Sequence, residues 1–264
     1  MSIQKEVMKR EYGYLQGTSQ KTTITQKKGQ YVSGYSVGIL YLDDCWYPVL
    51  PGNVANLSTY AFPVRLKKVP NCTTSRILNG DLTLKDSIIQ AAKELEAEGA
   101  RAISAACGFF GNFQKEVAAA VDIPVYLSSV VQVPWIATGL KPNQKIGVLT
   151  AYAKGITSDF LKNCGIQDLN AVVIKDLSEY QEFSAIIQDR GTFDHEGVRH
   201  EAVHAAKELV NQDGDIAAIL LECSDLPPYA ATIQSEIGLP VYDFITLINW
   251  IHHSTSQKPY DGFI

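Results

Sequence analysis

The chain has 264 residues, 46% of them hydrophobic, and a formal net charge of −5. This length and apolar content allow one large domain or two smaller lobes with a proper core. The acidic balance excludes a basic surface for nucleic acid or anionic lipid, and no signal-peptide or membrane-spanning run occurs, so we expect a cytoplasmic protein without nucleic-acid or membrane partners.

Residues 1–34 are polar and lack any helical or strand period, so we interpret them as an N-terminal extension. From Tyr35 onward, short β-rich runs alternate with amphipathic stretches. The expected strands are residues 37–42, 61–65, 102–106, 125–127, 145–150, 171–174, 216–221 and 241–242. The expected helices are residues 84–98, 112–121, 154–163, 198–211 and 228–237. This alternation predicts an α/β fold with parallel sheets flanked by helices.

An internal repeat divides the chain into two similar halves. The pentapeptide AAKEL occurs at 91–95 and again at 205–209, and each copy leads into a strand followed by a cysteine, Cys107 or Cys223. Each cysteine is followed 17 positions later by the proline of a PVY triplet. The repeat predicts two pseudo-symmetric lobes, and each cysteine comes just past the carboxyl end of a strand, where open parallel sheets bind ligands.

The repeat and the pattern of elements suggest a division of the chain. We expect a first lobe over 35–140, a second over 141–245, and a C-terminal helix and tail over 246–264 that pack back on the first lobe, with the active site in the cleft between the lobes. Cysteine is also a favoured core residue, and α/β proteins often repeat themselves weakly. The shared spacing favours the functional interpretation for Cys107 and Cys223, whereas Cys45, Cys72 and Cys164 lack the strand-edge setting and are assigned to packing or surface.

Two thiols facing one small molecule have a specific chemical use. Inversion of a stereocentre needs a base on one face of the carbon and a conjugate acid on the other, and a thiolate with a thiol supplies both. A free thiol is only a few per cent ionised at neutral pH, so we expect the helix that follows each cysteine to stabilise the thiolate.

The chain resembles the aspartate/glutamate racemase superfamily in the segments VGILYLD (37–43), SAACGFF (104–110), IGVLTAYAK (146–154) and LLECSDLPPY (220–229). This resemblance implies two pseudo-symmetric α/β lobes, no cofactor, no metal, and catalysis by one cysteine from each lobe. It also implies that dimers are common, so a homodimer is expected. Carried over by position, Cys107 and Cys223 match the two acid/base thiols, Asp43 falls near a polar substrate contact, and Thr150 ends the strand that opens the second lobe.

The chain departs from the glutamate racemases on both sides of the pocket. Gly108, Phe109 and Phe110 stand where those enzymes place Asn-Thr after the first cysteine, and Ser224 and Asp225 stand where they place Thr-His. The phenylalanines make the pocket more apolar and Asp225 adds an acid, so a substrate other than free glutamate is predicted. The segments LYLDDCWYPVLPGNVAN (40–56) and FPVRLKKV (62–69) resemble a divergent branch of the superfamily.

Smaller candidates lie near the same edge of the sheets. Arg65 is suited to pair with a substrate carboxylate, or else is a surface arginine. Ser128 and Ser129 can donate to a carboxylate or cap the next helix. The run Pro51-Gly52-Asn53 indicates a turn, in a loop over the cleft.

The motif HEAVH at 200–204 matches the zinc signature of metalloproteases. Alignment through AAKEL places His200 and His204 opposite polar residues of the first copy, which predicts a solvated helix face. A zinc site would need a third ligand, for which Glu222 is the one candidate. The motif is therefore interpreted as surface.

Together these features predict a cofactor-independent racemase or epimerase of an amino acid or related small carboxylate. Two alternatives stay open. The same fold can decarboxylate or cis-trans isomerise a small dicarboxylate, with one cysteine as proton donor or nucleophile. A non-catalytic ligand-binding module would keep the cleft without turnover.

Overall fold

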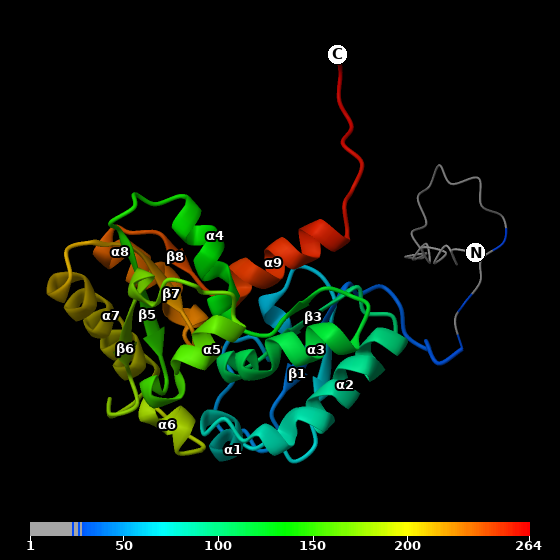
Figure 1. Ribbon diagram of the computed structural model, residues 1–264, viewed down its shortest axis with the longest axis horizontal. Helices are drawn as coiled ribbons and strands as arrows, with labels where there is room; N and C mark the ends of the chain where they lie inside the picture. Colours follow the sequence, from blue (N-terminus) through cyan, green and yellow to red (C-terminus); the bar gives the residue numbers. More distant parts are fainter. Residues whose placement is uncertain (1–22, 24–25, 27) are drawn as a thin grey trace, which may run out of the picture.

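The computed structural model describes residues 23, 26 and 28–264, so most of the expected extension over 1–34 lies outside the described residues. Within the described part, the strands form two four-stranded parallel sheets, in the orders β2-β1-β3-β4 and β6-β5-β7-β8 (Figure 1). The strands are β1 (Val37–Tyr41), β2 (Val64–Lys68), β3 (Ala102–Ala105), β4 (Val125–Tyr126), β5 (Lys145–Thr150), β6 (Val172–Asp176), β7 (Ile216–Leu221) and β8 (Val241–Tyr242). The two sheets repeat one topology and confirm the predicted fold class.

Helices flank both sheets (Figure 1). The α-helices are α1 (Thr74–Leu78), α2 (Lys85–Ala97), α3 (Gln114–Ala120), α4 (Val133–Thr138), α5 (Ser158–Asn163), α6 (Ser184–Ile187), α7 (His195–Gln212), α8 (Ala230–Ile237) and α9 (Phe244–Thr255). Short 3₁₀ turns link them: η1 (Leu57–Thr59), η2 (Leu82–Leu84), η3 (Gly108–Phe113), η4 (Ser129–Gln132), η5 (Ala153–Gly155), η6 (Leu169–Ala171) and η7 (Pro227–Tyr229).

Several predicted boundaries differ from the structure by two to four residues, and two of them differ for clear local reasons. The strand expected at 61–65 begins only at Val64, directly after Pro63, which has no N–H to give to a sheet. The helix expected at 154–163 begins at Ser158, because Thr157 caps it by accepting the N–H of Phe160 with its side chain.

The repeated AAKEL segments pack in the same way in both halves. Their leucines, Leu95 on α2 and Leu209 on α7, lie against glycines in the central strands β1 and β5. A Cβ atom on Gly38 would stand 2.9 Å from Leu95, and one on Gly147 would stand 2.8 Å from Leu209. A larger residue at either position would displace the packed leucine side chain, so both halves use a glycine to let the helix pack closely on the sheet.

The two sheets share buried contacts. One hydrophobic cluster joins Leu40 and Ile103 of the first sheet to Ile146 and Val148 of the second. Helix α9 covers the first sheet, and its buried residues Phe244, Leu247, Ile248 and Ile251 pack with Val37 and Ile39 of β1. No helix in the described part of the chain combines the length and apolar character that crossing a membrane requires.

Candidate active site

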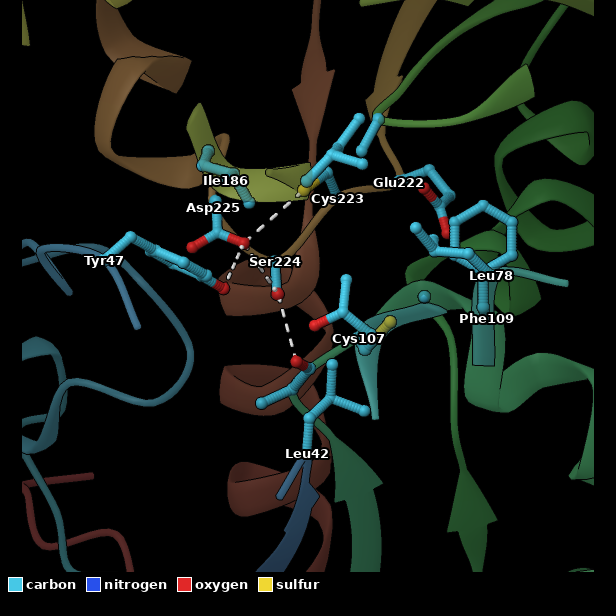
Figure 2. A pocket seen from close by; sticks show the side chains of 15 residues that line it. Leu42, Tyr47, Leu78, Cys107, Phe109, Ile186, Glu222, Cys223, Ser224 and Asp225 are labelled. Atoms are coloured by element: carbon cyan, nitrogen blue, oxygen red, sulfur yellow. Dashed lines mark hydrogen bonds between the residues drawn. The ribbon is translucent and has the colours of Figure 1, made fainter. Parts of the chain in front are cut away.

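The two repeated cysteines lie at corresponding places in the two sheets. Cys107 follows β3 and precedes η3, and Cys223 follows β7 and precedes η7. Both line one pocket with about 410 Å³ of empty space, part of it open to solvent (Figure 2). The lining residues are Leu42, Tyr47, Thr74, Leu78, Ala106, Cys107, Gly108, Phe109, Ala151, Ile186, Ile187, Glu222, Cys223, Ser224 and Asp225. The structure therefore brings together Cys107, Cys223, Gly108, Phe109, Ser224 and Asp225 of the predicted site.

The edges of the two sheets are hydrogen-bonded to each other around this pocket. The Ser129 hydroxyl donates to the carbonyl of Leu221 at the end of β7, at 2.9 Å. In the opposite direction, the Ser224 hydroxyl lies 3.1 Å from the carbonyl of Ala106, directly before Cys107. Each bond links the two halves of the chain, and the Ser129 bond is buried while the Ser224 bond is partly buried. Together they constrain the distance between the two cysteine-bearing loops.

Burial dominates the electrostatics of both thiols and corrects one expectation. Loss of hydration raises the pKa of Cys107 and of Cys223 well above the ordinary thiol value, and a neighbouring carboxylate raises each further, Glu222 for Cys107 and first Asp225 for Cys223. The N–H of Phe109 lowers the pKa of Cys107, and that of Asp225 lowers the pKa of Cys223, but these effects are smaller. The predicted stabilisation of thiolates is thus wrong, because the short turns after the cysteines do not offset burial.

Asp225 is positioned to accept a proton from Cys223. The Cys223 sulfur donates to Asp225 Oδ2 at 3.6 Å, and the hydroxyls of Tyr47 and Ser224 lie 3.2 and 3.4 Å from the same oxygen (Figure 2). Asn53 Nδ2 donates to Oδ1. Burial raises the pKa of Asp225 to about 6, although these donors act to lower it. At neutral pH the pair is therefore a thiol beside a carboxylate, with the hydrogen bond in place for proton transfer.

Glu222 is a second buried carboxylate in the pocket. It follows β7 directly, and its Oε2 accepts from the Thr150 hydroxyl at 2.7 Å. Burial raises its pKa to about 7, and the Thr150 bond opposes that rise. Among the described residues, Oε1 has no hydrogen-bond partner. The predicted residue Thr150 therefore acts on the site through Glu222.

Sequence reasoning did not assign Tyr47, Asn53 or Glu222 to the site. The run Pro51-Gly52-Asn53 indicated a turn over the cleft, and the structure shows that its asparagine reaches Asp225. Glu222 was considered only as a zinc ligand, although its place directly before Cys223 was a usable signal. Nothing in the sequence around Tyr47, which lies in a loop, indicated that its side chain would line the pocket.

Five predicted substrate contacts do not line this pocket: Asp43, Arg65, Ser128, Ser129 and Thr150. Asp43 forms an ion pair with Lys68, at 2.6 Å, and accepts the N–H of Asn71 at 2.8 Å. Arg65 donates through Nε to Glu98 at 2.8 Å. Glu98 follows α2, which leads into the start of β3, so this pair lies at the opposite edge of the sheet from the cysteines.

The hydroxyls of Ser128 and Ser129 form hydrogen bonds within the protein. Ser128 is fully buried and caps η4 by accepting the N–H of Val130 at 3.3 Å. Ser129 forms the inter-sheet bond to Leu221. Neither hydroxyl lines the pocket.

The histidines of HEAVH lie on α7, outside the pocket. His200 and His204 are exposed, and His204 Nε2 lies 3.3 Å from Glu208 Oε1 on the next turn. Within the described residues, no group of three His, Cys, Asp or Glu side chains is arranged to hold a metal ion.

Comparison with known proteins identifies the family. The family model for Asp/Glu/hydantoin racemases matches residues 88–250, a range that includes both pocket cysteines. The chain belongs to the Asp/Glu/hydantoin racemase family. The resemblance inferred from the sequence motifs is confirmed, and the enzyme fold of this family carries the pocket described above.

Two relatives of similar sequence are named for one particular activity. The chain is 32% identical over 238 residues to dimethylsulfoniopropionate lyase 7 of Emiliania huxleyi, a match that covers 86% of this chain and 69% of that protein. It is 30% identical over 234 residues to the dimethylsulfoniopropionate lyase of Durusdinium sp. clade D, covering 86% of this chain and 77% of the other.

Solved structures show the same fold at low identity. A glutamate racemase isoform from Bacillus anthracis superposes with a TM-score of 0.53 at 15% identity, covering 83% of this chain and 82% of the other. A Gly74Cys mutant of arylmalonate decarboxylase superposes with a TM-score of 0.55 at 17% identity, covering 86% of this chain and 97% of the other. Racemases and a decarboxylase thus share the architecture.

Proposed function

We propose that this chain is a lyase that removes the α-proton of dimethylsulfoniopropionate, or of a closely related sulfonium carboxylate, and eliminates dimethyl sulfide. Relatives at 30–32% identity carry the name of that activity. The proposal keeps the chemistry predicted from the cysteines, which is proton transfer at a carbon next to a carboxylate. It changes the fate of the carbanion from reprotonation to β-elimination.

One observation carries the proposal: the pocket is acidic as well as thiol-bearing. Glu222 and Asp225 line it together with both cysteines, and none of the lining residues in the described part of the chain is Lys, Arg or His. A dicarboxylate without a positive group of its own would meet repulsion there, because none of these lining side chains supplies a compensating cation. A substrate with a permanently positive sulfonium group is matched to this charge.

The elimination can be written with the groups present. The Cys223 thiol donates to Asp225. A cation about 5 Å from the sulfur, at an effective dielectric constant of about 20, would favour the thiolate by ~3 kcal/mol, or roughly two pKa units. The sulfonium group thus assists the base that the reaction needs, while the substrate's own carboxylate opposes part of this effect. Asp225 takes the thiol proton.

The thiolate then removes a proton from Cα. The C–H electron pair forms the Cα=Cβ double bond, the bond from Cβ to sulfur breaks, and dimethyl sulfide leaves with that electron pair as a neutral molecule. Acrylate remains. The hydroxyls of Tyr47, Thr74 and Ser224 line the pocket. Each donates to a protein oxygen, so to hold the substrate carboxylate one of them would turn away from Asp225, Asp44 or Ala106. Asp225 releases the proton to solvent after the products leave.

The direct test is to incubate the purified protein with dimethylsulfoniopropionate and measure dimethyl sulfide by gas chromatography and acrylate by NMR. We expect both products in equal amounts, and a loss of roughly 10³-fold in Cys223→Ser, because a serine hydroxyl is too weak a base at neutral pH. Glu236→Gln, at a surface ion pair with Lys207, is the matched control and should keep full activity. Absence of both products from the wild-type protein contradicts the proposal.

A second candidate is the racemase or epimerase predicted from the sequence, and the second thiol favours it. Cys107 lies in the same pocket as Cys223, whereas elimination needs only one base. In D₂O, a two-thiol racemase would exchange the α-hydrogen of an amino acid with loss of optical rotation. Cys107→Ser and Cys223→Ser would then each exchange mainly one enantiomer, with opposite preferences. Activity that survives Cys107→Ser excludes this candidate.

A further inference from the structure

The two carboxylates of the pocket, Asp225 and Glu222, differ in how many hydrogen bonds they accept. Four side-chain donors surround Asp225, from Tyr47, Asn53, Cys223 and Ser224. Glu222 accepts through Oε2 from Thr150 only, and its Oε1 is fully buried and has no partner among the described residues.

A buried carboxylate oxygen without a partner is costly and uncommon in a folded protein. The cost is reasonable where a ligand completes the site. Because Asp225 is already surrounded by donors, Glu222 is the carboxylate with capacity left for a ligand.

The fold places this free oxygen beside the reacting groups. Glu222 extends from the end of β7 toward the first sheet, where a Cβ atom on Gly108 would stand 1.8 Å from Oε1. Position 108 must therefore be glycine for the carboxylate to lie next to Cys107. Leu78 and Phe109 lie on the same side of the pocket (Figure 2). An apolar wall, an aromatic ring and one carboxylate together suit a bulky onium group.

We propose that Glu222 recognises the positively charged group of the substrate and selects onium carboxylates over neutral and doubly negative acids. The assignment of that charge to the substrate rests on the proposed function. A carboxylate substrate with a neutral side chain leaves the negative charge of Glu222 without an opposite charge, and a dicarboxylate places a second negative charge beside it. The contact is made by a residue that sequence reasoning had considered only as a metal ligand.

Two unreactive ligands of the same shape, one with and one without the positive charge, measure how much that charge contributes to binding. 3-(Trimethylammonio)propionate has a positively charged quaternary nitrogen at the position where 4,4-dimethylpentanoate has a neutral quaternary carbon. The two molecules are otherwise the same. Isothermal titration calorimetry at pH 8 should show that the wild-type protein binds the cation at least about tenfold more tightly, as expected for one partly screened ion pair. Glu222→Gln keeps the size of the side chain and should bring the two affinities to within about threefold.

A second variant tests the geometry while keeping the charge. A Cβ atom at position 108 would stand 1.8 Å from Oε1 and 2.7 Å from the carbonyl oxygen of Glu222, so Gly108→Ala displaces the whole residue and should also reduce the preference for the cation. Glu236→Gln removes an exposed carboxylate and should leave the preference as in the wild type. Thermal melts establish that each variant is folded.

The outcomes separate the two proposals. If the wild-type protein does not prefer the cation, or if the preference persists in Glu222→Gln and Gly108→Ala, the role of Glu222 is overturned. If the preference depends on Glu222 but dimethylsulfoniopropionate gives no dimethyl sulfide, the lyase proposal fails while Glu222 remains the contact for a different onium carboxylate.

Discussion

Replacement of Glu222 by glutamine should change how the stability of the protein depends on pH. Burial raises the pKa of Glu222 from its ordinary 4.5 to about 7 in the folded state. Between these values the folded protein holds a proton that the unfolded chain has released. Stability must therefore fall as the pH rises through this interval, because the folded state binds more protons.

The size of the fall follows from the two pKa values. At ~1.4 kcal/mol per pKa unit, a carboxyl group whose pKa rises from 4.5 to about 7 costs about 3 kcal/mol well above pH 7 and about 1 kcal/mol at pH 5. The wild-type protein should thus lose about 2 kcal/mol between pH 5 and pH 8 that Glu222→Gln does not lose. The buried amide adds its own cost of ~1–3 kcal/mol, but that cost does not vary with pH.

Urea denaturation at several pH values between 5 and 8, followed by circular dichroism, measures this difference. Asp225 has the same sign of pKa shift but is present in both proteins, so its contribution cancels in the comparison. Glu236→Gln changes only an exposed ion pair and should follow the wild-type curve. Parallel curves for wild type and Glu222→Gln would refute the reasoning, since they would mean that the carboxyl group is not held protonated by burial.

Three other outcomes are expected. Cys223→Ser should reduce dimethyl sulfide release by roughly 10³-fold and Cys107→Ser by much less, measured by gas chromatography; equal losses would favour a two-thiol reaction. Ser129→Ala should lower the free energy of unfolding by ~1–3 kcal/mol in urea titrations, because the carbonyl of Leu221 loses its buried donor, and an unchanged midpoint would show that the inter-sheet bond is unimportant. Activity should survive dialysis against a chelator, and its loss with recovery on adding zinc would revive the metal interpretation of HEAVH.

The sequence alone determined the fold and the place of the two thiols. Strand and helix periods are local properties, and the repeated AAKEL and PVY segments fix how far each cysteine lies from its neighbouring elements. Cys107 and Cys223 therefore follow the ends of equivalent strands, and parallel pairing brings both ends to ligand-binding edges. The family resemblance rests on the same local motifs.

Only the tertiary structure decided which groups share the pocket. Asn53 and Asp225 are 172 positions apart in the chain, yet they form a hydrogen bond because the loop after β1 crosses to the second sheet. Contact between Glu222 and Gly108 likewise depends on how the two sheets face each other. Arg65 illustrates a wrong local prediction. Its position at the end of a predicted strand suggested that it binds the substrate carboxylate, but in the structure it pairs with Glu98.

The ionisation of the thiols was also beyond local reasoning. A helix start after a cysteine predicts a stabilised thiolate, but a pKa reflects every neighbour and the loss of water around the group. Burial between two packed sheets, with Glu222 and Asp225 nearby, raises the pKa of both cysteines. Desolvation and long-range charge arise only when distant segments pack together, and for that reason the chemistry of this pocket was decided by the tertiary structure.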